Sequence, residues 1–157
     1  MEMPKPGAPQ QQLTKLAGTW TGDETLAPSP WDPKGGMAKA KVMNKLACDG
    51  WIVVQDYEQT REGKVSFRGH GVFSFDAAKN AVVMMWYDSM AGGPFEFTGQ
   101  WKGDVLALTG AAGGGTGRCT FDVTGGGYKF SMDVSQDGKS WQNFMQGTYK
   151  KSSSGAA

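Results

Sequence analysis

The chain has 157 residues, of which 16 are basic and 15 acidic, giving a formal net charge of +1. This length suits one domain with its own core, and the balanced charge favours neither a nucleic acid nor an anionic membrane as partner. No apolar run approaches the roughly 20 residues of a membrane-spanning helix, and the N-terminal segment lacks the apolar core of a signal peptide. These features predict a cytoplasmic protein.

Glycine is unusually frequent, with 24 residues, and aromatic residues make up 11% of the chain. A disordered chain would lack the aromatic residues, whereas glycine-rich turns between aromatic-rich strands are typical of antiparallel barrels and sandwiches. The composition therefore predicts an all-β fold. Cys48 and Cys119 fit neither a metal-binding spacing nor a disulfide framework, so we expect both to pack as small apolar residues.

Residues 1–12 contain three prolines and a glutamine run, and are expected to form a flexible arm. Apolar residues at helical spacing then predict a short helix over residues 10–17, which Gly18 ends. From residue 19 to residue 26 the sequence alternates with a period of two, which predicts the first strand. The prolines and glycines of residues 28–36 predict a long loop.

Nine further strands are predicted by the same alternation, most of them joined by short turns. The lysine face of residues 37–48 must be wet, so the opposite face points inward. The glycine-rich residues 110–115 predict a loose connection, and residues 152–157 a disordered tail. The predicted strands span residues 37–48, 51–60, 64–76, 81–88, 95–101, 105–109, 116–124, 128–135 and 140–150.

Ten strands connected in sequence predict an up-and-down antiparallel β-barrel, because closure leaves no strand edge unpaired. The barrel is expected to form a single domain over residues 13–151. A barrel of this size can be filled by its own side chains or can be hollow.

Four motifs lie along the chain: KLAGTW at residues 15–20, PWDPKGG at 30–36, VQDY at 54–57 and FRGHG at 67–71. In these motifs the sequence resembles an uncharacterised bacterial family of lipocalin-like proteins. More distantly, it is similar to the calycin superfamily, which includes fatty-acid-binding proteins and the haem-binding nitrobindins. The resemblance implies a ten-stranded barrel with a small helix near one opening and Trp20 plugging one end. It implies no activity, because none is established for that family.

The chain departs from these distant relatives at two ligand positions. Nitrobindins ligate haem iron through a histidine near the C-terminus, and residues 140–157 contain no histidine. Fatty-acid-binding proteins hold a carboxylate with an arginine and a tyrosine of the last strand, and here Tyr149 stands without the arginine. Neither set of ligand-binding residues has its full counterpart in this chain, so no cofactor is predicted.

His70 is the only histidine, so a multi-histidine metal centre is excluded and no metal is predicted. A single axial bond from His70 to a haem stays an alternative. Gly69 and Gly71 flank it, and glycine within a strand often marks the close approach of another group. Arg68 shares a face with His70, so the two could anchor a carboxylate or phosphate head group. If that face is outside, the pair is solvated or lies at a subunit interface.

Glu24 shares a face with Trp20, and a buried carboxylate is costly unless it has a partner. Arg68 is the expected partner, and the alternative is that Glu24 lies wet near the rim. Asp56 and Glu58 also share a face. They are interpreted as solvated residues rather than as a carboxylate pair for acid–base chemistry.

The leading functional prediction is the binding of a small hydrophobic or amphipathic molecule inside the barrel, since apolar pockets with few polar groups are typical small-molecule sites. The alternatives are a filled barrel that forms a homodimer, with Trp31, Trp51 and Trp86 at the contact, and a cavity enzyme. No catalytic residue is predicted. The predicted ligand-binding residues are Glu24, Trp31, Arg68, His70, Trp86 and Tyr149.

Overall fold

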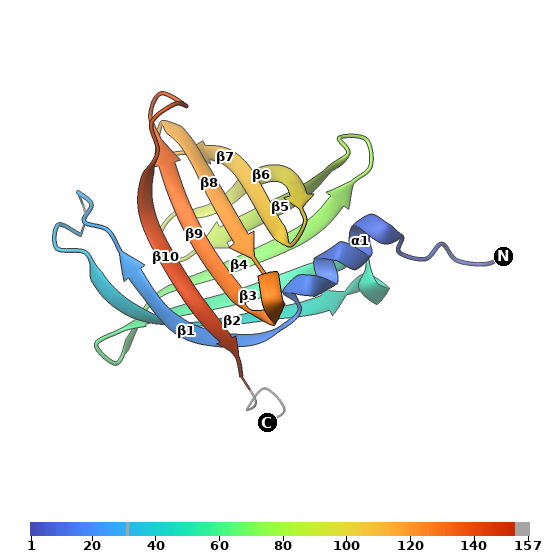
Figure 1. Cartoon of the computed structure of the whole chain (residues 1–157), viewed down its shortest axis with the longest axis horizontal. Helices are drawn as coiled ribbons and strands as arrows, with labels where there is room; N and C mark the ends of the chain where they lie inside the picture. Colours follow the sequence, from blue (N-terminus) through green and yellow to red (C-terminus); the bar gives the residue numbers. More distant parts are fainter. Residues whose placement is uncertain (31, 153–157) are drawn as a thin grey trace.

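The computed structural model describes residues 1–30 and 32–152. It confirms the all-β prediction: ten antiparallel strands form a closed barrel in which each strand pairs with its neighbours in sequence and the last strand pairs with the first (Figure 1). The strands are β1 Gly18–Leu26, β2 Gly36–Ala47, β3 Ile52–Arg61, β4 Lys64–Asp76, β5 Ala81–Asp88, β6 Gly92–Lys102, β7 Val105–Ala112, β8 Gly115–Asp122, β9 Tyr128–Ser135 and β10 Gln142–Lys151.

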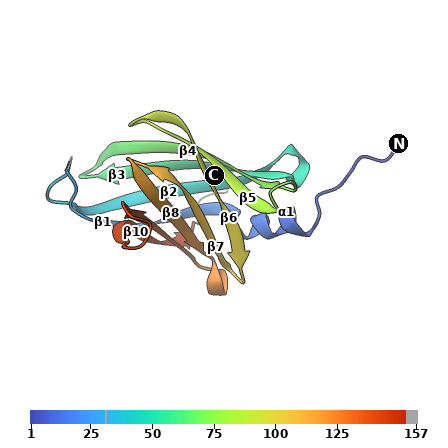
Figure 2. The ribbon, with the colours of Figure 1, turned by 90° about the horizontal axis from the view of Figure 1, so that it is seen from above.

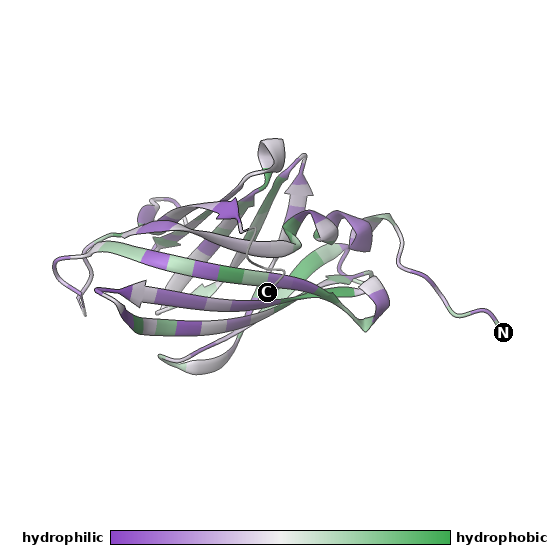
Figure 3. Ribbon diagram, turned by 90° about the horizontal axis from the view of Figure 1, so that it is seen from below, coloured by the Kyte–Doolittle hydropathy of each residue, from purple (hydrophilic) through white to green (hydrophobic). Residues whose placement is uncertain are grey.

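Side chains alternate between the interior and the solvent along each strand, as the period of two predicts. In β2 the small side chains of Ala38, Ala40 and Val42 are buried, whereas Lys39 and Lys41 between them are exposed. Figure 3 shows the same alternation of hydrophilic and hydrophobic residues along the strands. Burial of the inner face fixes the register of each strand pair, because a slip of one residue would turn that face outward.

One end of the barrel is closed by the N-terminal helix α1 (Ala8–Leu13) and the 3-10 turn η1 (Thr14–Leu16) that continues it (Figure 2). Leu13 and Leu16 are completely buried, and Trp20 behind them is only 3% exposed. The Trp20 indole N–H donates a hydrogen bond to the Leu16 carbonyl at 3.2 Å, and its ring packs on Tyr128 with centroids 5.1 Å apart. The prediction that Trp20 plugs one end is confirmed.

Helix α1 begins at Ala8, inside the segment predicted to be an arm. The Gly7 N–H donates to Gln10 Oε1 at 2.9 Å, which satisfies one of the backbone donors that a helix start leaves free. At the other end of the chain, the Ser152 N–H donates to the Thr19 carbonyl at 2.7 Å. The rest of the predicted tail, residues 153–157, lies outside the described residues. None of the helices described is long and apolar enough to cross a membrane.

The turn between β2 and β3 is the 3-10 turn η2 (Cys48–Gly50), and all three of its residues have positive φ. The expected positive φ at Asp49 and Gly50 is present, but the turn starts one residue earlier than predicted. Cys48 is consequently exposed, so its expected packing as a core residue is wrong, while Cys119 is buried as expected. A third 3-10 turn, η3 (Thr124–Gly126), joins β8 to β9.

The prediction of a loose connection over residues 110–115 is wrong. Strand β7 continues to Ala112 and β8 starts at Gly115, so only Gly113 and Gly114 form the turn, both with positive φ. Gly110 lies inside β7, at a position where a Cβ would overlap the Glu96 carbonyl oxygen. Glycine at this place serves close packing between strands rather than chain flexibility.

Candidate functional site

The interior of the barrel holds a fully buried carboxylate, that of Glu24 on β1. The Tyr57 hydroxyl on β3 lies 2.6 and 2.7 Å from its two oxygens, and Gln59 Nε2, two residues along, donates at 2.9 Å. The Tyr149 hydroxyl on β10 donates to the second oxygen at 2.5 Å. We call these four residues the Glu24 cluster.

The neighbouring strands make room for this cluster. Glu24 pairs with Gly147 of β10 on one side and with Ala38 of β2 on the other. A Cβ at Gly147 would overlap the Tyr149 hydroxyl and come within 3.0 Å of Glu24 Cγ. A residue larger than glycine at position 147 would therefore displace two members of the cluster.

The Glu24 carboxylate is surrounded by neutral hydrogen-bond donors rather than by a cationic side chain. Within residues 1–30 and 32–152, no ion pair includes Glu24. Burial, and then the nearby negative charge of Glu24, raise the pKa of Tyr57 and Tyr149 far above the usual tyrosine range. Both hydroxyls therefore stay protonated and donate to the carboxylate. Hydrogen bonds to an ionised acceptor are among the stronger ones in proteins.

Two expectations about Glu24 are wrong. It does not lie wet near the rim, and its partner is not Arg68, because Arg68 lies on the outer face of β4 and is exposed. In β4 the inner face belongs to the alternate set that contains Gly69, Gly71 and Phe73. Tyr149 is a predicted site residue that the structure does bring to Glu24, whereas Tyr57 and Gln59 were not predicted.

The end of the barrel opposite α1 is ringed by the β1–β2, β3–β4, β5–β6, β7–β8 and β9–β10 loops, and we call it the open end (Figure 1). Large apolar side chains point inward there and yet are only partly buried. Four of them pack against the buried core, and Met145 contacts Tyr57 and Gln59. These residues are Phe67, Trp86, Phe95, Met132 and Met145.

The apolar side chains of the open end contact the Glu24 cluster directly. Phe67 and Trp86 meet the Tyr57 ring edge-on, with centroids 5.9 and 6.2 Å away. Met145 Sδ lies 3.8 Å from the Tyr57 hydroxyl and 3.6 Å from Gln59 Nε2. Because Met145 pairs with Leu26, two residues beyond Glu24 toward the open end, it separates the cluster from the opening.

Trp86, a predicted site residue, lies against two glycines of the adjacent strand. A Cβ at Gly69 would overlap the Trp86 ring, and one at Gly71 would come within 3.1 Å of it. The group whose close approach these glycines indicate is therefore the Trp86 indole. Its N–H donates to Asp88 Oδ2 at 3.0 Å, at the end of β5.

A second polar layer lies between the Glu24 cluster and the closed end. Asn44 Nδ2 donates to the Leu16 carbonyl at 2.8 Å, and Gln55 Nε2 donates to Asn44 Oδ1 at 2.9 Å. Gln55 Nε2 also lies 3.4 Å from the Tyr128 hydroxyl. This layer ties β2 and β3 to the end of the N-terminal helical segment, and its buried polar atoms are satisfied within the fold.

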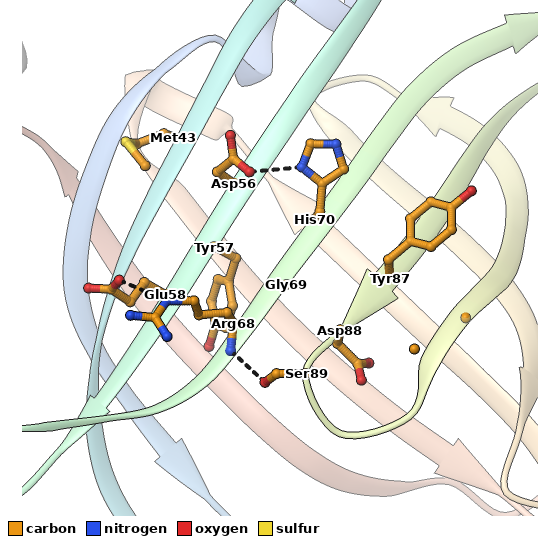
Figure 4. A pocket seen from close by; sticks show the side chains of 12 residues that line it. Met43, Asp56, Tyr57, Glu58, Arg68, Gly69, His70, Tyr87, Asp88 and Ser89 are labelled. Carbon is orange, nitrogen blue, oxygen red and sulfur yellow. Dashed lines mark hydrogen bonds and ion pairs between the residues drawn. The ribbon is translucent and has the colours of Figure 1, made fainter.

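His70 and Arg68 lie on the outer face of β4, where they line an open pocket of about 650 Å³ (Figure 4). His70 Nδ1 lies 2.8 Å from Asp56 Oδ1, and Arg68 Nε lies 3.5 Å from Glu58 Oε2. The side chains of Asp56 and Glu58 are in contact with solvent, as predicted, and each has a basic neighbour of its own. Exposed ion pairs of this kind contribute little stability. Neither His70 nor Arg68 lines the interior.

Trp31, the remaining predicted site residue, lies outside the described residues. Its neighbour Asp32 binds Arg61 at the end of β3, with 2.6 Å between Oδ2 and Nη1. Arg61 Nη2 also donates to the Gly35 carbonyl at 2.8 Å, which fixes the β1–β2 loop to the rim of the open end. In the described part of the chain, no three His, Cys, Asp or Glu side chains converge to hold a metal ion.

The comparisons with known proteins agree with this architecture. A family model described as "Protein of unknown function (DUF1579)" matches residues 5–151. The structure is similar to the crystal structure of Rv2717c from M. tuberculosis, with a TM-score of 0.70 and 15% identity over 92% of this chain and 98% of that chain. At this identity the likeness establishes the fold alone. No curated protein matches the chain.

Proposed function

Since the chain belongs to the DUF1579 family, whose function is unknown, we propose a function from the barrel itself: it binds a small apolar or amphipathic molecule in the open end. The observation that carries this proposal is the partial burial of inward-facing apolar side chains. A barrel that only needs to be stable gains by burying such side chains completely, since buried apolar area stabilises the fold. Apolar walls left accessible from an opening are the usual form of a small-molecule site.

The two halves of the interior have different roles in this proposal. Next to α1 the interior is filled by side chains such as Phe73, Leu106 and Phe121, which are almost completely buried. Toward the open end, the wall consists of aromatic and methionine side chains. Methionine adapts to irregular shapes because it is unbranched and flexible, so Met132 and Met145 suit a wall that closes around a guest molecule.

A dye that fluoresces in apolar surroundings tests the proposal. Nile red should bind the purified protein, and Phe95→Arg should weaken this binding by about tenfold because it places a charge in the apolar wall. Gln100→Arg is the matched control, since Gln100 is an exposed residue of the same strand β6. It should leave dye binding unchanged.

Native mass spectrometry of freshly purified protein provides an independent measurement. A ligand taken up during expression should appear as a mass increment that organic extraction removes. Absence of both the increment and dye binding would contradict the proposal and would favour a barrel filled by its own side chains.

A further inference from the structure

We infer that the open end selects apolar molecules that carry an amine, and that Glu24 is the residue that determines this selectivity against carboxylic acids. This inference rests on the proposed function, because it specifies the ligand of the same interior site. It reverses the charge that Arg68 and His70 would have favoured, since both of those side chains lie on the outer face.

Among the described residues, the charged side chain buried in the interior is that of Glu24. Glu24 is buried among neutral donors, with no cationic side chain in contact among the described residues. Asp88, at the end of β5 and so at the rim of the open end, accepts the Trp86 indole N–H and two N–H groups of the β5–β6 loop, and it lines the outer pocket beside Arg68. The guanidinium at this rim, that of Arg61, already pairs with Asp32 at 2.6 Å and so adds no net charge.

Aromatic rings lie next to the Glu24 cluster on the side of the open end. Phe67 and Trp86 pack edge-on against Tyr57, and the Tyr57 hydroxyl contacts Glu24 directly. The faces of aromatic rings attract cations, and tryptophan does so most strongly. An aromatic wall in front of a carboxylate is therefore suited to an organic ammonium group.

A carboxylic acid would meet the opposite conditions. A second anion close to Glu24 would be repelled, and the low dielectric of the interior strengthens this repulsion. An ammonium that displaced the flexible Met145 side chain would instead approach the Glu24 cluster from the side of the opening.

The test is competition against bound Nile red at pH 7 by three ten-carbon molecules, each below its micellar concentration: 1-decylamine, 1-decanol and decanoate. We expect decylamine to displace the dye at a concentration about tenfold lower than decanoate, with decanol between them. Glu24→Gln should remove most of this difference. Glu58→Gln is the control, since it removes an outward-facing carboxylate of β3 next to Tyr57, and it should preserve the difference.

The outcomes separate this inference from the proposed function. If Nile red binds but decanoate competes as well as decylamine, the inference is overturned and the binding proposal stands. If neither the dye nor any competitor binds, both are overturned. The concentrations at which the three competitors displace the dye from the unmodified protein already decide the charge preference, so this measurement does not depend on any variant.

Discussion

At the scale of single residues, the barrel accepts a buried carboxylate because three side chains donate to it. Tyr57, Gln59 and Tyr149 come from two strands on opposite sides of β1 in the sheet order, so the cluster forms only when the barrel is assembled. Removing a single donor leaves a carboxylate oxygen short of a partner in a place that is closed to solvent.

Tyr149→Phe should therefore lower the free energy of unfolding by about 1.5–3 kcal/mol, the range for a lost hydrogen bond to a charged group. Urea denaturation at pH 7, followed by tryptophan fluorescence, measures this change. Tyr87→Phe serves as the control, because Tyr87 is exposed on the outer face of β5. A loss for Tyr149→Phe as small as that for the control would mean that the hydroxyl contributes no net stability.

The inward direction of Glu24 and of Trp20 could be predicted from the alternation in β1. The partners of Glu24 could not be predicted, because they depend on the register of strands that are far apart in sequence. Tyr57 and Gln59 alternate with more exposed residues of their strand, but nothing local distinguishes a tyrosine that binds a carboxylate from one that fills a core. The prediction that Arg68 is the partner of Glu24 is wrong because Arg68 lies on the outer face of β4. The inner face of that strand carries its glycines and phenylalanines.

At the scale of secondary structure elements, the segment α1–η1 acts as a lid that the first strand holds in place. The Trp20 indole connects the two through its hydrogen bond to Leu16 and its packing on Tyr128. Loss of this side chain would leave a cavity between the helix and the barrel floor.

Trp20→Ala should lower the free energy of unfolding by about 3–5 kcal/mol, as for other large buried aromatic residues. The control is Trp141→Ala, because Trp141 is only partly buried and packs against Arg118 at 4.2 Å. Chemical denaturation of both variants measures the difference. If Trp20→Ala costs less than 1 kcal/mol, Trp20 does not act as a plug.

The predicted bounds of β1, β2 and β3 lie within one residue of the observed ones. Strands β4, β5 and β9 have the predicted bounds. The loose connection predicted for residues 110–115 is wrong because glycine has two structural roles in a barrel. It permits turns with positive φ, as at Gly113 and Gly114, and it permits close packing within a strand, as at Gly110. Composition alone does not separate these uses.

At the scale of the whole molecule, several buried groups can ionise only when the chain unfolds. Burial raises the pKa of the Cys119 thiol to about 12, and it also raises the pKa of Tyr57, Tyr128 and Tyr149. In the unfolded chain these groups ionise near their ordinary values, about 8.5 for cysteine and about 10 for tyrosine. Stability is therefore complete below these values and decreases as the pH rises through them.

The midpoint of urea unfolding should be constant from about pH 7 to pH 8 and should fall steeply above about pH 10. The loss should amount to about 1 kcal/mol per buried tyrosine between pH 10 and pH 11. The Tyr149→Phe variant should show a shallower decline, because it has one fewer group that ionises on unfolding. A midpoint that does not change up to pH 11 would show that these hydroxyls ionise in the folded barrel.

The pairing of β1 with β10 also has a consequence for how the protein is made. The first strand to leave the ribosome finds its second neighbour only when the last strand has been translated, and Tyr149 reaches Glu24 at the same moment. Until then the nascent sheet has two free edges and an incompletely bonded carboxylate, which are conditions that expose a growing chain to aggregation. Completion of this barrel therefore waits for β10, and a holding chaperone would act on the open sheet until β10 pairs with β1.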